Sequence, residues 1–264
     1  MRLPNAEKEA SRLLVLDETG STNDVLVGGA ADEPDFSVVV TGSQTAGRGR
    51  LGREWVAPRG SSLSISVLLR PLLPSGKPLA LEHFGWLPLI AGVAMCRAVA
   101  PLVSGAVGLK WPNDVQIDGL KVSGLLAELV PTADAVVMGS GVNLSLTSAE
   151  LPTPTSTSLA LSGASLQGDE LADAVLTAYL RQLRSLCADF VRDGADVAAS
   201  GTLDLVTALC TTLGQQVRVE LPGGSDLIGT ATGIDPHGRL VVRRASDGLV
   251  SAVAAGDVTH LRYE

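Results

Sequence analysis

The stretch VGLKWPNDVQIDGLKVSGLLAEL, residues 107–129, contains two short apolar runs, a turn and a longer returning run. The dipeptide Asp118-Gly119 is a strong signal for a two-residue hairpin turn, because both residues tolerate a positive φ. The runs on either side are therefore expected to pair as antiparallel strands. Lys110 and Lys121, two of only four lysines in the chain, lie on these strands. A partly buried lysine is costly unless it meets an anion, so the segment predicts a strand pair that carries an anion site.

Outward from this hairpin, strand-like and helix-like runs alternate from residue 13 to about 190, which predicts a mixed α/β fold. Ser21, followed three residues later by Asp24, is typical of a helix N-cap. Residues 79–100 have apolar positions at helical spacing and end before Pro101, which predicts a long helix. The expected strands are LLVLDE, FSVVVTG, SLSISVLL, which alternates with period two, and AVVMGSGVNLSL; LPTPTSTS is an expected loop, and DELADAVLTAYLRQLRSLCADF an amphipathic helix.

The pattern changes after Gly214. The short runs QVRVEL, LIGTATGI, RLVVRR, LVSAV and THLR are separated by PGG, PHG and SDG turns. Such closely spaced short strands predict a small antiparallel barrel of about five strands. The chain is therefore expected to divide into a large domain, residues 1–212, and a small one, residues 213–264.

Composition narrows the function classes. With 28 acidic and 20 basic residues the net charge is −8, which disfavours general binding to a phosphate backbone. The three cysteines are far apart with no CxxC pair and are expected to be buried thiols, and there is no HExxH or GxSxG motif. No apolar run is expected to be long enough to span a bilayer, and the first residues lack the apolar segment of a signal peptide. These features favour a cytoplasmic protein without DNA or membrane partners.

The most conspicuous motif is QTAGRGRLGREW, residues 44–55, which Arg59 follows. From Gly47 to Arg59 there are four arginines and one glutamate, so the segment is locally basic within an acidic chain. Glycines let backbone amides approach a phosphate, and guanidinium groups bind its oxygens in pairs. The motif therefore predicts an anion site, with a solvated loop or an RNA-binding cluster as alternatives. GRGRLG also fits the dinucleotide fingerprint, but Pro58 and Gly60 prevent the helix that this fingerprint requires, and no kinase motif follows.

Several smaller motifs are ambiguous when each is taken alone. Lys110-Trp111-Pro112-Asn113-Asp114 fits either a binding turn or a turn with a core tryptophan. Gly124 fits either a bulge or space cleared for a ligand, and the glycines of GSGVN, residues 139–143, permit a close ligand. Ser21-Thr22-Asn23 fits helix capping better than binding.

Taken in order, these motifs strongly resemble the biotin protein ligases. The resemblance covers residues 13–262 and rests on STN, QTxGRGRxGRxW, the SxSxS strand, KWPND, KxxGLL, GxGxN and the small C-terminal barrel. It implies a catalytic domain like that of class II synthetases, with a mixed sheet and flanking helices, followed by an SH3-like domain. Leu125 and Ser140 depart from the usual residues of these motifs without removing a functional group. With only 20 residues before Ser21, the DNA-binding arm of some members is expected to be absent.

The resemblance also implies a reaction. Biotin and ATP would form biotinyl-5′-AMP, and a lysine of a biotin carboxyl carrier protein would then attack it, with Mg²⁺ as cofactor and no assigned metal ligands. The implied catalytic residues are Lys121, Arg50, Arg48 and Asp114. The implied biotin-binding residues are Ser21, Thr22, Asn23, Gln44, Gly47, Arg48, Lys121 and Gly124, and the implied nucleotide-binding residues are Arg50, Arg53, Trp55, Asn113 and Asn143. A lipoate or octanoyl ligase and a non-catalytic biotin sensor are the alternatives.

Overall fold

The computed structural model describes the chain except residues 131–133, 222–224, 255–256 and 262–264. Its helices are α1 (Thr22–Gly29), α2 (Trp86–Val99), α3 (Gly168–Arg192) and α4 (Thr202–Leu209), with short 3-10 turns at Ala6–Lys8, Arg50–Gly52, Leu81–His83 and Ala100–Leu102. Its strands are β1 (Arg12–Leu16), β2 (Ser37–Thr41), β3 (Gly47–Arg48), β4 (Glu54–Trp55), β5 (Ser62–Leu69), β6 (Val107–Lys110), β7 (Asp114–Ile117), β8 (Leu120–Val130), β9 (Ala135–Asn143), β10 (Gln216–Glu220), β11 (Asp226–Ile234), β12 (Leu240–Arg244), β13 (Val250–Val253) and β14 (Asp257–His260).

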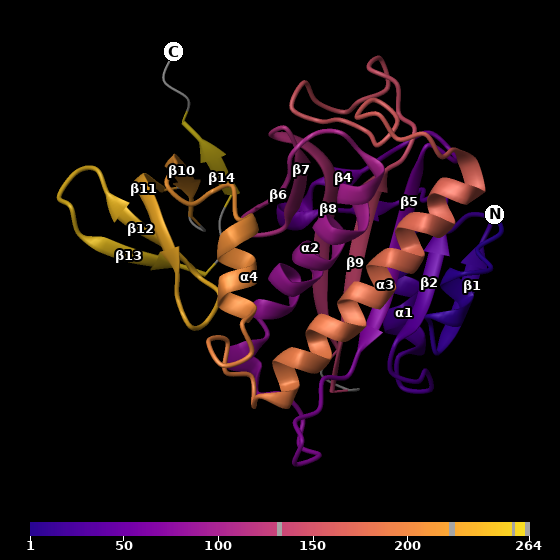
Figure 1. Cartoon of the computed structure of the whole chain (residues 1–264), viewed down its shortest axis with the longest axis horizontal. Coiled ribbons are helices and arrows are strands. Elements are labelled where there is room, and N and C mark those ends of the chain that lie inside the picture. The colour runs from indigo at the N-terminus through magenta and orange to yellow at the C-terminus, as the bar shows by residue number, and fades with distance from the viewer. Residues whose placement is uncertain (131–133, 222–224, 255–256, 262–264) are drawn as a thin grey trace.

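Two sheets organise these elements (Figure 1). The larger has seven strands in the order β1-β2-β5-β9-β8-β7-β6, and the smaller has five antiparallel strands in the order β13-β12-β11-β10-β14. In the larger sheet β1 and β2 are parallel, whereas the other neighbours are antiparallel. The predicted mixed α/β fold with a small antiparallel unit is confirmed. The PGG turn lies outside the described residues.

The predicted hairpin is present at the expected position. β7 and β8 are joined by Asp118 and Gly119, whose φ angles are +50° and +80°, as a tight two-residue turn requires. The Pro- and Thr-rich segment, residues 151–158, is a loop, as expected. It is tied to the hairpin by a bridge between Lys121 and Ser156.

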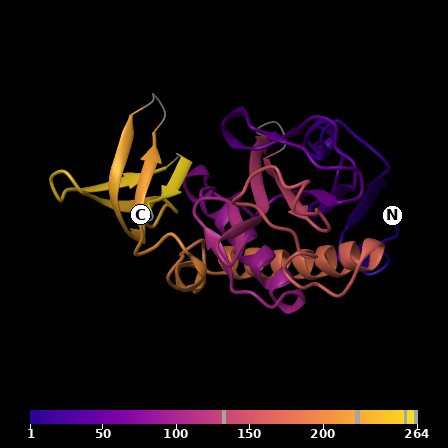
Figure 2. The same ribbon diagram turned by 90° about the horizontal axis from the view of Figure 1, so that it is seen from above.

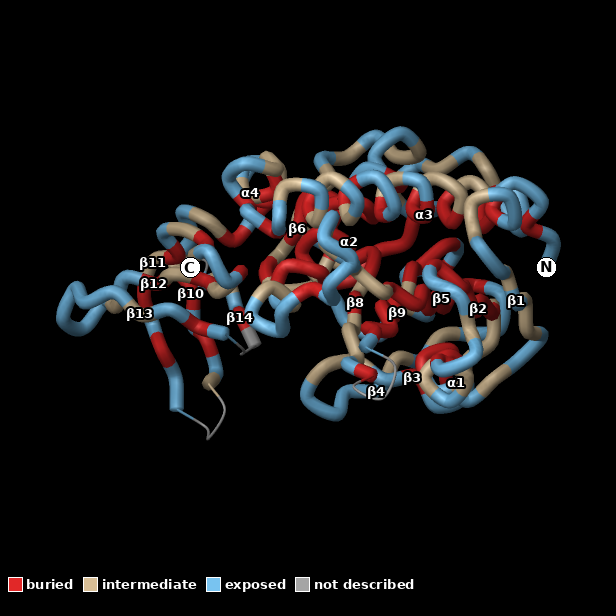
Figure 3. The backbone as a smooth tube through the Cα atoms, turned by 90° about the horizontal axis from the view of Figure 1, so that it is seen from below, coloured by how far each residue is buried: buried red, intermediate tan, exposed pale blue. Residues whose placement is uncertain are grey.

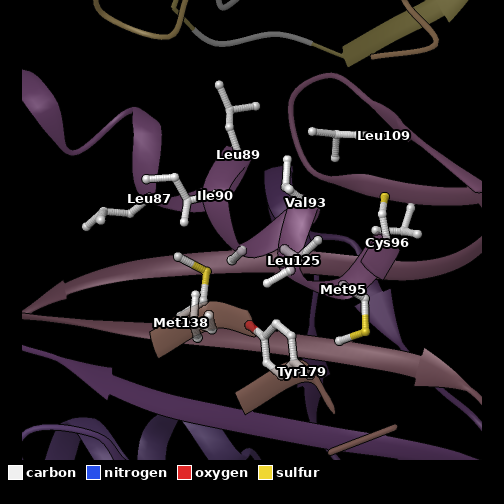
Figure 4. Close-up of a cluster of buried hydrophobic side chains, with 14 of the residues drawn as sticks. Leu87, Leu89, Ile90, Val93, Met95, Cys96, Leu109, Leu125, Met138 and Tyr179 are labelled. Atoms are coloured by element: carbon white, nitrogen blue, oxygen red, sulfur yellow. The ribbon is translucent and has the colours of Figure 1, made fainter. Parts of the chain in front are cut away.

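Layers of helix cover the large sheet on both faces (Figure 3). α2 and α3 pack on one face, and α1 and the β3–β4 hairpin lie on the other. Figure 4 shows α2 side chains such as Leu87 and Val93 packed near Leu125 and Met138 of the sheet, beside Tyr179 of α3. All eight residues of β5 are buried, although its alternating sequence is typical of a strand with one solvated face. Its serines instead face the α1 side, where the site lies.

Two expectations about the apolar segments need correction. The predicted helix 79–100 begins only at Trp86, and Leu81–His83 before it form a separate 3-10 turn. Between them Gly85 packs closely on the small sheet, where a Cβ would meet the carbonyl of His237 at 2.6 Å. The segment Leu81–Leu102 is also long and apolar enough to cross a membrane, contrary to the expectation from sequence, but 67% of its most apolar window is buried inside the fold. This burial is typical of a core helix. Cys96 and Cys210 are buried as expected, whereas Cys187 is partly exposed.

Candidate functional site

A pocket of about 330 Å³ opens on the α1 side of the large sheet. Its walls come from the start of α1, the β3–β4 hairpin, the strands β5 to β9, the loop at residues 152–156 and β14. Nearly every residue singled out from the sequence lines this pocket: Ser21, Thr22, Asn23, Gln44, Arg48, Arg50, Arg53, Trp55, Asn113, Asp114, Lys121, Gly124 and Asn143. The fold thus brings together motifs that are up to 122 positions apart in the sequence, from Ser21 to Asn143.

One end of the pocket is lined by uncharged polar side chains, which adjoin the Glu128 carboxylate. The backbone N–H and the hydroxyl of Thr22 donate to Oε1 of Gln44 at 2.9 and 3.2 Å. The hydroxyl of Ser66 is 2.8 Å from that of Thr22 and 2.5 Å from Oδ1 of Asn23. Ser21 caps α1, accepting from the N–H of Asp24 at 3.4 Å as predicted. This end offers donors and acceptors fixed in place by their own hydrogen bonds, which suits an uncharged polar group.

The other end carries charge. Nζ of Lys121 lies 2.7 Å from Oδ1 of Asp114, an ion pair whose alignment falls outside hydrogen-bond geometry. The Arg50 guanidinium donates to Oδ1 of Asn113 at 3.2 Å, and the Asn113 amide donates to the carbonyl of Leu125 at 2.9 Å. Asn113 therefore joins the β3–β4 hairpin to β8, and Lys121 lies on β8 close to this contact.

Arg48 lies differently from the expectation that it holds a phosphate. Its guanidinium donates to Asp24 at 2.8 Å and to Oε1 of Glu128 at 3.3 Å. Because Arg48 donates to it, the pKa of Asp24 is below its usual value, and the pKa of Arg48 is raised for the same reason. The amide of Asn23 also donates to Glu128, at 3.0 Å. In this structure Arg48 therefore ties the hairpin to α1 and β8, and its role toward phosphate stays a prediction.

Trp55 fills the centre of the pocket wall. Its indole lies against the backbone of β8 and β9. A Cβ on Gly141 would be 2.3 Å from the ring, and one on Gly124 would be 3.4 Å from the ring and 3.0 Å from Nζ of Lys121. Gly139 similarly makes room for Asn23, whose Oδ1 would be 2.5 Å from a Cβ there. These strand glycines therefore make room for protein side chains. All three also line the pocket, so their contact with a ligand stays a prediction.

Trp55 is also oriented by a cation. Nζ of Lys121 lies 5.9 Å from its ring centroid, within cation–π range. Within the described part of the chain, the buried Nε1 of Trp55 has no hydrogen-bond partner. Most buried polar groups are hydrogen-bonded, so this donor is an exception in the site.

Three further residues of the motifs make contacts within the protein that their motifs did not predict. Gly47 does not line the pocket. It is the first residue of β3 in the hairpin, and a Cβ there would meet Gln44 and the carbonyl of Trp55 at 2.3 and 2.4 Å. Asn143 is buried at the end of β9 and donates to the carbonyl of Thr157 at 2.9 Å, which fixes the loop over the site. Ser140 points to the opposite face and pairs with the buried hydroxyl of Tyr179 at 3.0 Å.

Sequence reasoning missed several lining residues. Ser64 lines the pocket and Ser66 supports it from β5, and the SxSxS alternation could have identified both. Glu128 carried no such signal, because its role depends on Arg48 approaching from the hairpin. Val258 and Thr259 of β14 also line the pocket, so the small sheet contributes directly to the site.

The pocket is basic within an acidic protein. Among its lining residues Arg48, Arg50, Arg53, Lys110 and Lys121 oppose Glu54, Asp114 and Glu128. The chain as a whole carries −8. Burial strengthens the field of these cations, so the site is suited to an anionic ligand that also has an uncharged polar end.

Comparison with known families agrees with this site. Residues 18–143 match the biotin/lipoate A/B protein ligase family, and residues 212–261 match the biotin protein ligase C-terminal domain. The chain belongs to the biotin protein ligase family. It is 37% identical to the biotin–[acetyl-CoA-carboxylase] ligase of Mycobacterium tuberculosis over 95% of this chain and 90% of that protein. It is 27% identical to the bifunctional ligase/repressor BirA of Escherichia coli over 95% of this chain and 74% of that protein.

Solved structures show the same fold. The biotin protein ligase of Aquifex aeolicus in complex with biotin and ATP has a TM-score of 0.70 and 26% identity, over 96% of this chain and 100% of that one. The ligase of Leishmania major in complex with biotinyl-5-AMP has a TM-score of 0.62 and 26% identity, over 93% of this chain and 99% of that one.

Proposed function

We propose that this protein is an ATP-dependent ligase that converts biotin to biotinyl-5′-AMP and transfers the biotinyl group to a lysine of a biotin carboxyl carrier domain. The observation that carries the proposal is the two-ended pocket, in which the uncharged network of Thr22, Asn23 and Gln44 and the cations Arg50 and Lys121 share one cavity. Biotin has a matching arrangement of functional groups, with an uncharged ureido ring at one end and a carboxylate at the other.

The first step joins two anions. A carboxylate oxygen of biotin attacks the α-phosphorus of ATP, and the bond from that phosphorus to the bridging oxygen of pyrophosphate breaks. At about 4 Å and an effective dielectric near 20, a carboxylate and a phosphate oxygen repel each other by about 4 kcal/mol. Lys121 and Arg50 stand where they would offset this repulsion. Catalysis would then rest on positioning and charge stabilisation, with no side-chain nucleophile.

Mg²⁺ is part of the proposal as a partner of ATP. No cluster of three or more His, Cys, Asp or Glu side chains suited to a metal occurs among the described residues. Magnesium sites with substrate phosphates commonly use only one or two carboxylates, so this pattern fits a nucleotide-bound ion. Of the carboxylates that line the pocket, Asp114 is the one that would hold the ion; its Oδ1 makes no hydrogen bond within the described chain and pairs with Nζ of Lys121 at 2.7 Å. When bound, the ion would supply further positive charge at the phosphates.

The second step transfers the acyl group. The lysine amine of the carrier attacks the carbonyl carbon of biotinyl-5′-AMP, the bond from that carbon to the phosphate oxygen breaks, and AMP leaves. The amine loses a proton, and Asp114, beside Lys121, is the proposed acceptor or orienting group. Trp55 and Asn143 are the proposed nucleotide contacts, and Arg53 would add charge.

We also place the domain boundary at residues 212–213 and the enzyme in the cytoplasm, where its three free thiols would persist.

The decisive experiment measures pyrophosphate release from purified protein with ATP and Mg²⁺, with and without biotin, followed by biotin transfer to a carrier domain detected with streptavidin. Release that requires biotin, followed by labelling of one carrier lysine, is the expected result. Lipoate and octanoate in place of biotin are the controls for the related ligases. A folded protein that releases pyrophosphate with lipoate but not with biotin would overturn the assignment, and one that binds biotin without any release would be a sensor.

A further inference from the structure

Two buried tryptophans of the catalytic domain hold the same turn of the small sheet. Nε1 of Trp86, the first residue of α2, donates to the carbonyl of Pro236 at 2.8 Å. Nε1 of Trp111, in the turn between β6 and β7, donates to the carbonyl of Gly238 at 3.0 Å. Both indoles are at most 2% exposed. Figure 2 shows the small sheet as a separate unit beside the large one, so these bonds bridge two distinct bodies of structure.

The turn that accepts these bonds is itself well fixed. The carboxylate of Asp235 accepts from the N–H groups of His237 and Arg239, both at 2.9 Å, and from Nε of Arg239 at 2.6 Å. Burial acts to raise the pKa of Asp235, but the hydrogen bonds from Arg239 and His237 and the charge of Arg239 outweigh it, so this pKa is below its usual value. A turn with this many internal bonds presents its carbonyls in defined directions.

Only one of the two tryptophans leads directly into the pocket. Trp111 is followed by Pro112, Asn113 and Asp114, and the last two line the site. Its backbone N–H also donates to Oγ1 of Thr212 at 3.0 Å, at the junction between the domains. Neither tryptophan lines the pocket itself, and Trp86 has no lining residue among its immediate neighbours in the chain.

The same junction is held from the small sheet. Nε2 of His260, on β14, lies 3.2 Å from Oγ1 of Thr212. The two residues before His260 on this strand, Val258 and Thr259, form part of the pocket wall. The turn at Trp111 is therefore fixed at its backbone through Thr212 and at its ring through Gly238, and both contacts depend on where the small sheet lies.

Asn113 links the turn at Trp111 to the β3–β4 hairpin. Its side chain accepts from Arg50 and donates to the carbonyl of Leu125, while the N–H of Leu125 donates to the carbonyl of Asn113 at 2.9 Å. A shift of the turn would therefore move the Arg50 contact as well as the Asp114 carboxylate.

We propose that the small C-terminal sheet is a positioning element for adenylate formation, and that Trp111 is the positioning residue through which it sets Asn113, Asp114 and Arg50. This inference rests on the proposed function. It predicts an effect at the charged end of the pocket and none at the uncharged end, because Thr22 and Gln44 have no contact with this turn.

Two matched variants test it in the full-length protein. Trp111→Phe and Trp86→Phe each remove one indole N–H and leave one carbonyl of the same turn without its donor. Thermal unfolding should show a similar fall in Tm for both. In biotin-dependent pyrophosphate release, Trp111→Phe should lower kcat about tenfold, the factor that corresponds to one neutral hydrogen bond, and raise the KM for ATP. The KM for biotin should stay within about twofold, and Trp86→Phe should keep near wild-type kinetics.

Thr212→Val is the second route to the same test, in case Trp111→Phe fails to fold. It preserves the side-chain shape and removes the acceptor of the Trp111 N–H, so the same change in kcat and in the KM for ATP is expected. Equal kinetics for the Trp111 and Trp86 variants, or an effect of Trp111→Phe on the KM for biotin alone, would overturn the inference. If the wild-type protein releases no pyrophosphate with biotin, the proposed function itself fails, which is a different result.

Discussion

Lys121 lies between a carboxylate and an aromatic ring. The carboxylate of Asp114 pairs with its ammonium at 2.7 Å, and the Trp55 ring lies 5.9 Å away. Gly124 makes room for its Nζ, which a Cβ there would approach to 3.0 Å. These neighbours hold a compact cation at one point of the pocket, where a planar guanidinium would need more space.

Lys121→Ala is expected to abolish measurable adenylate formation with little change in folding. Removing one electrostatic contact at a reacting centre typically lowers kcat by about 10²–10³-fold. The alanine variant would also leave the Asp114 carboxylate without its ion-pair partner. Lys121→Arg should be impaired too. Pyrophosphate release measures the effect, circular dichroism checks the fold, and Lys77→Ala, an exposed lysine, is the control. Normal release by a folded Lys121→Ala protein would contradict the assignment.

Asp24→Asn tests the contact that holds Arg48. The variant keeps the shape of the side chain but removes the charge, so the hairpin should exchange its amide hydrogens faster and biotin should bind more weakly. The lowered pKa of Asp24 gives the pH dependence its sign. The contact is complete well above pH 3.8, the ordinary value for Asp, and is lost as the pH falls through the lowered value.

Hydrogen exchange between pH 3 and 7 measures this dependence, which Asp24→Asn should abolish. Glu18→Gln is the matched control, since it weakens another arginine–carboxylate pair, with Arg59, outside the pocket. If Asp24→Asn and Glu18→Gln have the same effect on the hairpin, Arg48 does not hold it.

At the level of elements, the β3–β4 hairpin has little burial of its own. Its strands have only two residues each, and Leu51 at its tip is 65% exposed with a positive φ of 57°. Ordering each residue costs about 1–2 kcal/mol of backbone entropy, so the hairpin depends on its contacts with the rest of the site. Those contacts are the Arg48 ion pairs, the Arg50 bond to Asn113 and the Trp55 ring.

The segment 47–61 is therefore expected to open when no ligand is bound and to become ordered over the adenylate. Hydrogen exchange with and without biotin and ATP tests this expectation. Protection of the unliganded segment equal to that of the large sheet would show that it does not act as a lid.

Arg50→Gly should still form biotinyl-5′-AMP but release it faster, because the hairpin loses its bond to Asn113 and a partner for phosphate. Released adenylate would then react with lysines of unrelated proteins. The measurements are the adenylate dissociation rate and the biotinylation of a bystander protein that lacks a carrier domain. Wild-type retention of the adenylate by this variant would contradict the expectation.

Over the whole molecule, the site exists only where several bodies of structure meet. The pocket takes residues from α1, the hairpin, five strands of the large sheet and β14 of the small one. A ligand that binds all of them stabilises the folded state as a unit, because none of these groups is assembled in the unfolded chain.

A hydrolysis-resistant analogue of biotinyl-5′-AMP should therefore raise Tm strongly. At about 1,000 times its Kd the stabilisation is about 4 kcal/mol, which for a protein of this size corresponds to roughly 8–16 °C. Biotin alone should give a smaller shift, and Lys121→Ala should reduce the shift with the analogue. Differential scanning calorimetry measures these values. An unchanged Tm at saturating analogue would mean that the pocket does not hold it.

Much of this architecture could be predicted from the sequence. The predictable parts have one physical property in common, which is that they depend on neighbours a few residues away. The turn at Asp118 and Gly119, the cap at Ser21 and the five short strands of the small sheet arise from local φ preferences, side-chain reach and strand periodicity. The order of the motifs also identified the ligase family and most of the lining residues.

Tertiary structure alone decided the rest. Arg48 meets Glu128, which is 80 residues away, and Trp111 meets Gly238 at a separation of 127. The β5 serines are buried, where their alternation suggested a solvated face, because α1 and the hairpin cover that face. The strand glycines accommodate Trp55 and Asn23, two side chains that reach them from distant parts of the sequence. Such pairings depend on which surfaces meet when the layers pack, and nothing in the residues beside each position carries that information.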